Sequence, residues 1–180
     1  MIITISGELG SGKSTIAKLL AEELKIKHYS TGDLMRKLAK EKGITFLELT
    51  ELAKTDSEVD KEIDAYTKKL SETEEDFVID SRMAFYFIKN SINIYLAIDE
   101  VVGAQRILLA KRNEEHYKNL DEAIEYVAKR KNSETQRYIK LYGVDCHDLT
   151  KEYYDLIIDT TTLLPEMVVN EIIDFVENFK

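Results

Sequence analysis

The sequence has too few cysteines for a disulfide framework and no long apolar run that could span a membrane. Its 180 residues include one cysteine, Cys146, and one proline. A single cysteine excludes an internal disulfide framework and any site built from several cysteines, and it suits a reducing compartment. No apolar run approaches the ~18 residues that would cross a bilayer. The first residues show neither a charged n-region nor a cleavage site, so we expect no secretory signal and a cytoplasmic location.

Basic residues are also fewer than acidic ones. The chain has 25 lysines and arginines against 34 aspartates and glutamates, for a formal net charge of -9. An anionic surface repels phosphate backbones and anionic lipids, so we expect no membrane partner, and the balance disfavours RNA binding. One stretch, 106–140, has the opposite sign, with nine basic and six acidic residues. Length and a hydrophobic content of 44% indicate one globular domain, which we expect to be a monomer.

Glycine is scarce, and three of the seven glycines lie close together near the start of the chain. The segment from Gly7 to Ser14 reads Gly-Glu-Leu-Gly-Ser-Gly-Lys-Ser and fits the phosphate-binding P-loop pattern G-x-x-x-x-G-K-[ST] without a mismatch. Its backbone N–H groups would surround phosphate oxygens, Lys13 would reach the β- and γ-phosphates, and the Ser14 hydroxyl would ligate Mg²⁺. The expected ATP-binding residues here are Gly7, Glu8, Leu9, Gly10, Ser11, Gly12, Lys13, Ser14 and Thr15.

Short apolar segments alternate with longer amphipathic ones along the whole chain. Strands are expected at 2–6, 26–29, 77–79, 92–98 and 156–158. Helices are expected at 13–25, 33–42, 45–54, 58–70, 101–112, 122–141 and 165–179. Short strands rich in isoleucine that alternate with helices are typical of an α/β fold whose parallel sheet is covered on both faces.

A second group of polar residues follows the expected strand at 26–29. Residues 30–36 read Ser-Thr-Gly-Asp-Leu-Met-Arg. Hydroxyl groups, a glycine and an arginine one turn into a helix would suit a phosphorylated acceptor. The same residues also fit an ordinary helix start, with Thr31 or Asp33 as the cap and Arg36 on the surface.

The P-loop followed by this segment resembles the nucleoside monophosphate kinases, which include adenylate and cytidylate kinases. Asp80-Ser81-Arg82 lies where cytidylate kinases carry Asp-Gly-Arg, and Arg130, Glu134 and Arg137 resemble late positions of that family at the same spacing. Ser14 favours the cytidylate form, as does the lack of a Gly-Phe-Pro-Arg segment, whereas residues 30–36 are closer to adenylate kinases. The resemblance runs over nearly the whole chain and is strongest to the short archaeal cytidylate kinase-like form.

This resemblance implies a P-loop NTPase three-layer fold with a five-stranded parallel sheet, a helical acceptor-binding flap and a lid. The core would comprise 1–30, 77–112 and 141–180. The acceptor-binding insertion would be 31–76, and the lid region 113–140.

The implied activity is ATP-dependent phosphorylation of CMP or dCMP to CDP or dCDP by direct in-line transfer with Mg²⁺. Such transfer needs positioning and charge neutralisation, and it needs no general base because the acceptor phosphate is already an anionic nucleophile. The catalytic residues implied are Lys13, Arg82, Arg130 and Arg137. The acceptor-binding residues implied are Thr31, Arg36, Asp80, Arg82, Arg130, Glu134 and Arg137. Arg106 lies in the segment where relatives place an arginine against adenine.

Two alternatives remain at this point. The chain could be an adenylate kinase or another small-molecule P-loop kinase, or a nucleotide-binding module without transfer activity. The three histidines lack metal-ligand spacing, and Cys146 beside His147 is not thereby a catalytic pair. A panel of nucleoside monophosphate acceptors separates these alternatives.

Overall fold

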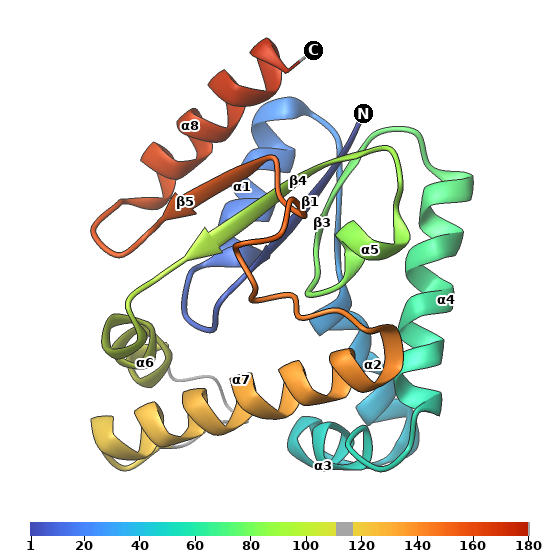
Figure 1. Ribbon diagram of the computed structural model, residues 1–180, viewed down its shortest axis with the longest axis vertical. Coiled ribbons are helices and arrows are strands. Elements are labelled where there is room, and N and C mark those ends of the chain that lie inside the picture. Colours follow the sequence, from blue (N-terminus) through green and yellow to red (C-terminus); the bar gives the residue numbers. More distant parts are fainter. Residues whose placement is uncertain (111–116, 180) are drawn as a thin grey trace.

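A computed structural model describes residues 1–110 and 117–179 (Figure 1). Five parallel strands form one sheet in the order β2-β3-β1-β4-β5. The strands are β1 (Ile2–Gly7), β2 (Lys27–Ser30), β3 (Phe77–Asp80), β4 (Ser91–Ala97) and β5 (Leu156–Asp159). The described helices are α1 (Lys13–Leu24), α2 (Thr31–Lys42), α3 (Phe46–Leu52), α4 (Glu58–Thr73), α5 (Ala84–Phe87), α6 (Glu100–Leu109), α7 (Leu120–Tyr142) and α8 (Pro165–Asn178). The predicted α/β class and the five-stranded parallel sheet are confirmed.

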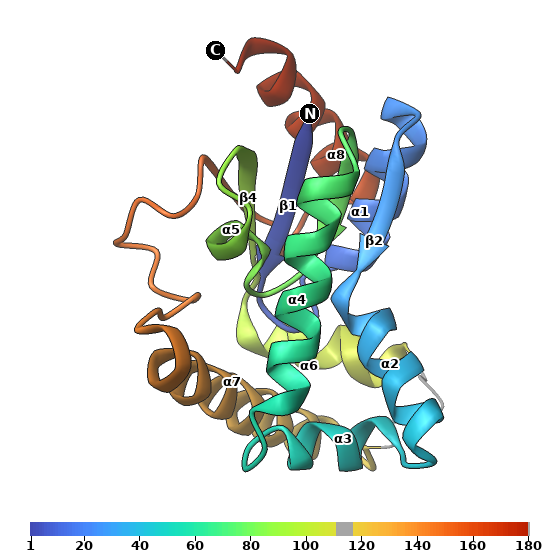
Figure 2. The ribbon, with the colours of Figure 1, turned by 90° about the vertical axis from the view of Figure 1, so that its right-hand side faces the viewer.

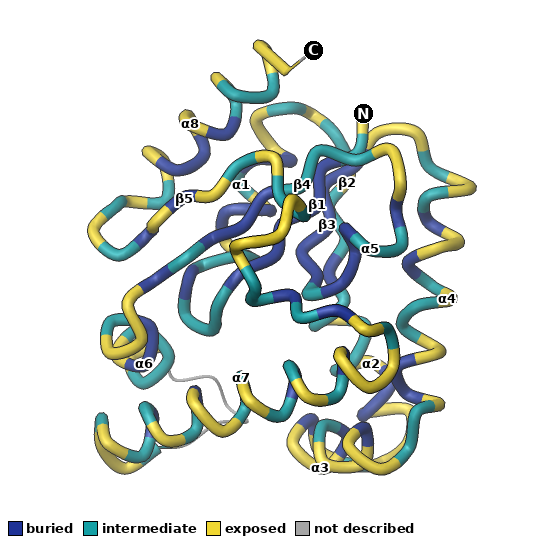
Figure 3. The backbone as a smooth tube through the Cα atoms, viewed as in Figure 1, coloured by how far each residue is buried: buried dark blue, intermediate teal, exposed yellow. Residues whose placement is uncertain are grey.

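The sheet is the middle of three layers because its strands bury both faces. Ile3 and Ile5 of β1 pack with α1 and α8, whereas Phe77 and Ile79 of β3 pack on the opposite face with Leu70 of α4 and with α5. The central strands are accordingly buried along most of their length (Figure 3). Burial on both faces explains why these strands are continuous apolar runs rather than alternating ones.

Most differences from the predicted elements lie at helix ends. Helix α2 begins at Thr31 because Ser30, rather than Thr31 or Asp33, is its N-cap: the Ser30 hydroxyl accepts from the Asp33 amide at 3.3 Å. The predicted helix 101–112 corresponds to α6, and residues 111 and 112 lie outside the described residues. Helix α5 was not predicted, since four residues are too few to show a helical period.

Helices α2, α3 and α7 lie at the end of the sheet where the parallel strands finish (Figure 1). Helix α7 crosses below the sheet, and α2 and α3 lie beside it, while α4 runs back along the sheet (Figures 1 and 2). Helices α2, α3 and α4 share a small apolar core around Leu38, Leu49 and Val59. Sites in open α/β sheets form at this end of the strands.

Helix α7 is continuous from Leu120 to Tyr142, so the expected boundary between lid and core at 140/141 falls inside one helix. Residues 113–116 of the expected lid region lie outside the described residues. In the part of the chain that the structure describes, no helix is long and apolar enough to cross a membrane.

Candidate active site

The P-loop turns from β1 into α1 with a backbone that requires glycine. Gly7, Gly10 and Gly12 all have positive φ, at 143°, 81° and 87°. A Cβ on Gly10 would lie 2.3 Å from the carbonyl oxygen of Gly103 in α6, so the loop touches α6 backbone to backbone. Glycine at both contact positions is what permits this approach, which holds the loop at the start of α1.

Lys13 lies over the loop and is held by its carbonyl groups. Its Nζ donates to the oxygens of Gly7 at 2.9 Å and Glu8 at 2.5 Å. Burial and the nearby Arg82 guanidinium lower the pKa of Lys13 well below its usual value. An anionic phosphate in the loop would offset both effects, because it favours the charged form of the amine.

Ser14, the predicted magnesium ligand, donates its hydroxyl to Asp80 Oδ2 at 2.8 Å. Asp80 ends β3, and it also contacts Ser30 at 3.0 Å and His28 Nε2 at 2.7 Å. Burial opposes ionisation of Asp80, but the hydrogen bonds from His28 and Ser14 outweigh burial and hold its pKa below the usual value. A hydroxyl beside an ionised carboxylate fits Mg²⁺, which prefers oxygen ligands and binds through one or two carboxylates plus substrate phosphates.

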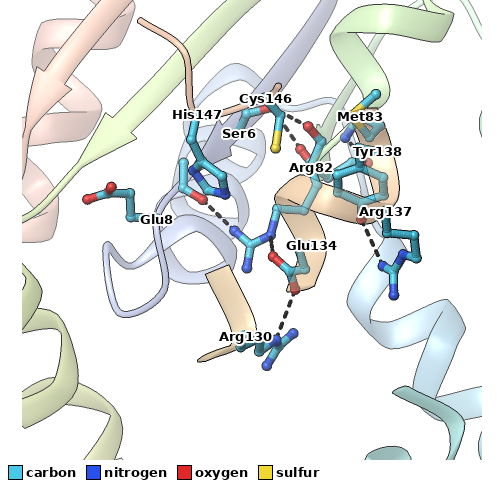
Figure 4. A network of polar contacts seen from close by, with 12 residues as sticks. Ser6, Glu8, Arg82, Met83, Arg130, Glu134, Arg137, Tyr138, Cys146 and His147 are labelled. Atoms are coloured by element: carbon cyan, nitrogen blue, oxygen red, sulfur yellow. Dashed lines mark hydrogen bonds and ion pairs between the residues drawn. The ribbon is translucent and has the colours of Figure 1, made fainter. Parts of the chain in front are cut away.

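Arg82 and Arg130 meet at one buried carboxylate, that of Glu134 (Figure 4). Glu134 of α7 forms an ion pair with Arg82, with 2.6 Å between its Oε2 and Arg82 Nε, and it accepts a hydrogen bond from Arg130 Nε at 2.9 Å; Glu134 is 5% exposed. Burial opposes its ionisation, yet the two guanidinium charges lower the pKa of Glu134 to about 2. Arg82 also donates to the Gly7 oxygen at 2.5 Å, so this group is attached to the P-loop.

Arg137 and Arg36 extend the cationic lining toward α2, α3 and α4. Arg137 Nε lies 3.3 Å from Asp60 Oδ2 on α4. Arg36 pairs with Asp33, and the guanidinium groups of Arg36 and Arg130 lie over the Phe46 ring, 5.3 and 5.6 Å from its centroid. Phe46 of α3 therefore links α2 to α7. Sequence reasoning missed Asp60 and Phe46 because each lies on an ordinary amphipathic helix face.

Nearly all predicted site residues line one cleft of about 560 Å³ at this end of the sheet. The exceptions are Gly7 and Glu8. The Glu8 amide donates to the Leu96 oxygen, and its carboxylate pairs with Lys131 at 2.5 Å, so both groups are engaged outside the cleft. Thr31 lines the cleft and donates to the Asp80 carbonyl at 3.3 Å.

Arg106 lies at the other end of the cleft, and its Nη2 donates to the carbonyl oxygens of Thr160 and Thr161 at 2.8 and 3.2 Å. Ile107, Leu163 and Pro165 line the cleft there as well. The cleft thus has an apolar end near α6 and α8, the P-loop in the middle, and an arginine-rich end near α2, α3 and α4. This arrangement can hold two anionic ligands with their charged ends together.

Comparison with known proteins agrees with this geometry. A model of the cytidylate kinase-like family matches residues 2–162. A cytidylate kinase from Sulfolobus acidocaldarius is 39% identical over 175 residues, which cover 96% of this chain and 92% of that protein. A cytidylate kinase from Methanosphaera stadtmanae is 35% identical over 180 residues and 100% of both chains.

Solved structures show the same fold at low sequence identity. A shikimate kinase from Bacteroides thetaiotaomicron has a TM-score of 0.66 at 15% identity and covers 98% of both chains. An uncharacterized protein from Eubacterium ventriosum has a TM-score of 0.71 at 21% identity and also covers 98% of both chains. Neighbours this distant in sequence support the fold alone.

Proposed function

The chain belongs to the cytidylate kinase-like family, and from this we propose that it transfers the γ-phosphoryl group of ATP to CMP or dCMP. One observation of the structure supports this most directly: Lys13, Arg36, Arg82, Arg130 and Arg137 line a single cleft beside the P-loop. In a chain with nineteen lysines and six arginines, four of the six arginines lie at the arginine-rich end. Arginine is the side chain that binds phosphate with planar, bidentate geometry.

The donor would bind with its phosphates in the P-loop. The loop amides and the positive end of α1 attract the β- and γ-phosphates, and Lys13 would exchange its bonds to loop carbonyls for phosphate oxygens. Ser14 and Asp80 would hold Mg²⁺, which when bound neutralises charge on the β- and γ-oxygens. The adenine would lie at the apolar end of the cleft near Arg106.

The acceptor would enter from the flap side with its phosphate toward Arg36 and Arg82. Arg130 and Arg137 would offset the negative charge that spreads over the transferred group. No residue is needed as a general base, since a phosphate oxygen of the acceptor is the nucleophile. Glu134 keeps Arg82 and Arg130 in place, and it is a positioning residue in this scheme.

An acceptor panel tests the proposal. Purified protein with ATP and Mg²⁺ is assayed for ADP formation with CMP, dCMP, UMP, AMP and GMP. We expect turnover with CMP or dCMP, at a kcat/KM well above that for the other acceptors. Turnover with AMP alone would contradict the cytidylate assignment and favour an adenylate kinase.

A variant pair addresses the alternative of a nucleotide-binding module. Arg82→Ala and Arg36→Ala should reduce acceptor-dependent turnover while ATP binding stays within a few-fold of wild type. Lys37→Ala on the exposed side of α2 is the matched control. ATP binding without any acceptor-dependent ADP formation in the wild-type protein would favour the non-catalytic module.

A further inference from the structure

A small cavity lies next to the arginine-rich end of the cleft. It has a volume of about 20 Å³ and lies between the P-loop, α6, α7 and the segment that joins α7 to β5. This volume has room for about one water molecule and is too small for a phosphate or a base. Arg82 and Glu134 line both the cavity and the cleft, whereas His147 lines the cavity and not the cleft. His147 therefore lies on the side of Arg82 that faces away from the substrates.

Contacts on two sides fix the position of His147. Its Nδ1 lies 2.9 Å from the hydroxyl of Tyr95, a residue of β4 that is 1% exposed. Its backbone amide donates to Asp145 Oδ1 at 2.9 Å. The Tyr154 hydroxyl donates to the carbonyl oxygen of the preceding residue, Cys146, at 2.6 Å. These contacts anchor the imidazole ring although it lies on a segment between two elements of secondary structure.

The second ring nitrogen of His147 is placed differently. Nε2 is buried, and among the described residues no hydrogen bond engages it. Figure 4 shows the imidazole turned toward the Arg82 guanidinium, with which it shares the lining of the small cavity. A buried polar atom without a hydrogen bond is uncommon, so its position next to Arg82 needs a physical reason.

The charges around the cavity determine which form of the ring is present. Burial and the Arg82 charge lower the pKa of His147 to about 3, so the ring is neutral at physiological pH. Glu8 and Lys131, which also line the cavity, pair with each other. A neutral imidazole has one N–H and one lone pair, whereas a guanidinium has only donors. Beside that cation the favoured tautomer keeps its proton on Nδ1, shared with the Tyr95 hydroxyl, and turns the Nε2 lone pair toward Arg82.

We propose that His147 is a positioning residue for Arg82 in phosphoryl transfer. The guanidinium is bounded by the Glu134 carboxylate, by the carbonyl oxygen of Gly7 and by the neutral imidazole, which leaves its other N–H groups for a phosphate oxygen in the cleft. A group that fixes the direction of a phosphate-binding side chain contributes to the rate without touching the substrate. The inference rests on the proposed function, because it assumes that Arg82 binds a phosphate of the acceptor.

The alternative is that His147 only fills space between the P-loop and α7. The two roles differ in their dependence on Arg82. A packing residue supports the enzyme whether or not Arg82 is present, whereas a positioning residue acts only through Arg82. The two can therefore be separated by replacing His147 in proteins with and without the arginine.

A double-mutant cycle makes this comparison. Both kcat and KM are measured for His147→Leu and Arg82→Ala, singly and combined, with the acceptor that the wild-type protein uses best. Leucine occupies much of the space of the ring and removes its nitrogens. We expect His147→Leu to lower kcat/KM for the acceptor by roughly 10-fold, as for a lost polar contact to a charged group, and to leave the KM for ATP near its wild-type value. In the Arg82→Ala background the same change should have little further effect.

A conservative replacement and an exposed neighbour provide the controls. His147→Gln keeps a polar atom at a reach similar to that of Nε2, and it should recover most of the lost activity. Lys151→Ala, exposed on the same segment, should leave kcat/KM unchanged. If His147→Leu fails to fold, Tyr95→Phe replaces it in the cycle. That change removes only the hydroxyl that anchors the ring, and its smaller loss should again be confined to proteins that retain Arg82.

Each outcome bears on one hypothesis. An equal loss in both backgrounds, or wild-type kinetics in His147→Leu, would overturn the positioning role while leaving the proposed function intact. Turnover of a nucleoside monophosphate other than CMP or dCMP would overturn the cytidylate assignment alone, because the cycle uses whichever acceptor is phosphorylated. A wild-type protein that phosphorylates no nucleoside monophosphate would overturn the proposed function, and the positioning role with it.

Discussion

Arg82 and Glu134 form an ion pair of 2.6 Å that joins the end of β3 to the middle of α7. The side chains of both are largely buried, at 13% and 7% exposed, and Arg82 also donates to the P-loop carbonyl of Gly7. The pair therefore connects the phosphate-binding loop to the helix that supplies Arg130 and Arg137. This contact holds helix α7 against the end of the sheet that carries the P-loop.

Removing the carboxylate of Glu134 should destabilise the fold. Glu134→Ala leaves Arg82 and Arg130 without their shared counter-charge, and breaking a buried pair in this way costs about 3–5 kcal/mol in the free energy of unfolding. Urea denaturation measures the loss. Glu125→Ala is the control, because Glu125 lies on the same helix, is exposed and, among the described residues, pairs with Lys129. A loss under about 1 kcal/mol for Glu134→Ala would show that the pair contributes little.

Replacing Lys13 should lower kcat without lowering the free energy of unfolding. Lys13→Ala removes a charge aimed at the β- and γ-phosphates, and we expect kcat with CMP to fall by about 10²- to 10³-fold. Because burial already disfavours the charged amine, the free energy of unfolding should stay level or rise. Steady-state kinetics and urea denaturation check the two expectations, with Lys18→Ala on the exposed side of α1 as the control. A kcat within threefold of wild type would contradict the assigned role.

Asp80 should determine the Mg²⁺ concentration that is needed for half-maximal activity. In Asp80→Asn the amide keeps contact with Ser14 and loses the negative charge, so we expect the Mg²⁺ concentration for half-maximal activity to rise by roughly 10-fold or more. Titration of activity with Mg²⁺ at fixed ATP measures the change. Partial recovery of kcat at high Mg²⁺ would support a metal role, whereas a loss that Mg²⁺ cannot reverse would place Asp80 elsewhere in the mechanism.

Gly10 and Gly43 form a matched pair that separates backbone strain from steric contact. Both have positive φ, at 81° and 69°, so alanine is strained at either position. A Cβ on Gly10 would meet the Gly103 backbone at 2.3 Å, whereas no described residue lies within 4 Å of one on Gly43. We expect Gly43→Ala to cost about 1 kcal/mol of unfolding free energy, and Gly10→Ala to cost clearly more and to weaken ATP binding. Equal costs would show that α6 moves aside freely.

His147 should make the fold sensitive to mild acid. Burial and the Arg82 charge lower its pKa to about 3 in the folded state, against an ordinary value near 6.5. Between pH 6.5 and pH 3 the unfolded chain therefore binds a proton that the folded protein does not, and stability falls as pH falls.

Comparison of His147→Asn with the wild-type protein tests this pH dependence. His147→Asn should flatten the dependence of unfolding free energy on pH between 6.5 and 4.5, by at most ~1.4 kcal/mol per pH unit. Asp64, with its pKa raised to about 6, contributes with the opposite sign, so the difference between variant and wild type is the measure. Identical pH profiles for the two proteins would contradict a neutral, buried His147.

Sequence reasoning succeeded where the information is local. The glycine spacing from Gly7 to Gly12, the order of strands and helices, and the residues that follow β2 and β3 could all be recognised from a few neighbouring positions. The spacing of apolar residues follows backbone geometry that repeats every two residues in a strand and every 3.6 in a helix. It can therefore be recognised without knowing which elements pack against each other. Helix ends were less accurate because a single cap, such as Ser30, decides them.

The cleft itself depends on contacts between distant parts of the chain. The amino-acid sequence alone indicated a P-loop on an α/β sheet and the arginines that accompany it. It could not indicate that Glu134 would be buried between Arg82 and Arg130, that Asp80 would meet Ser14, or that the α4 face with Asp60 and Asp64 would point into the cleft. An amphipathic pattern indicates that one face of a helix is covered. Which groups cover that face depends on how the helices pack in the tertiary structure.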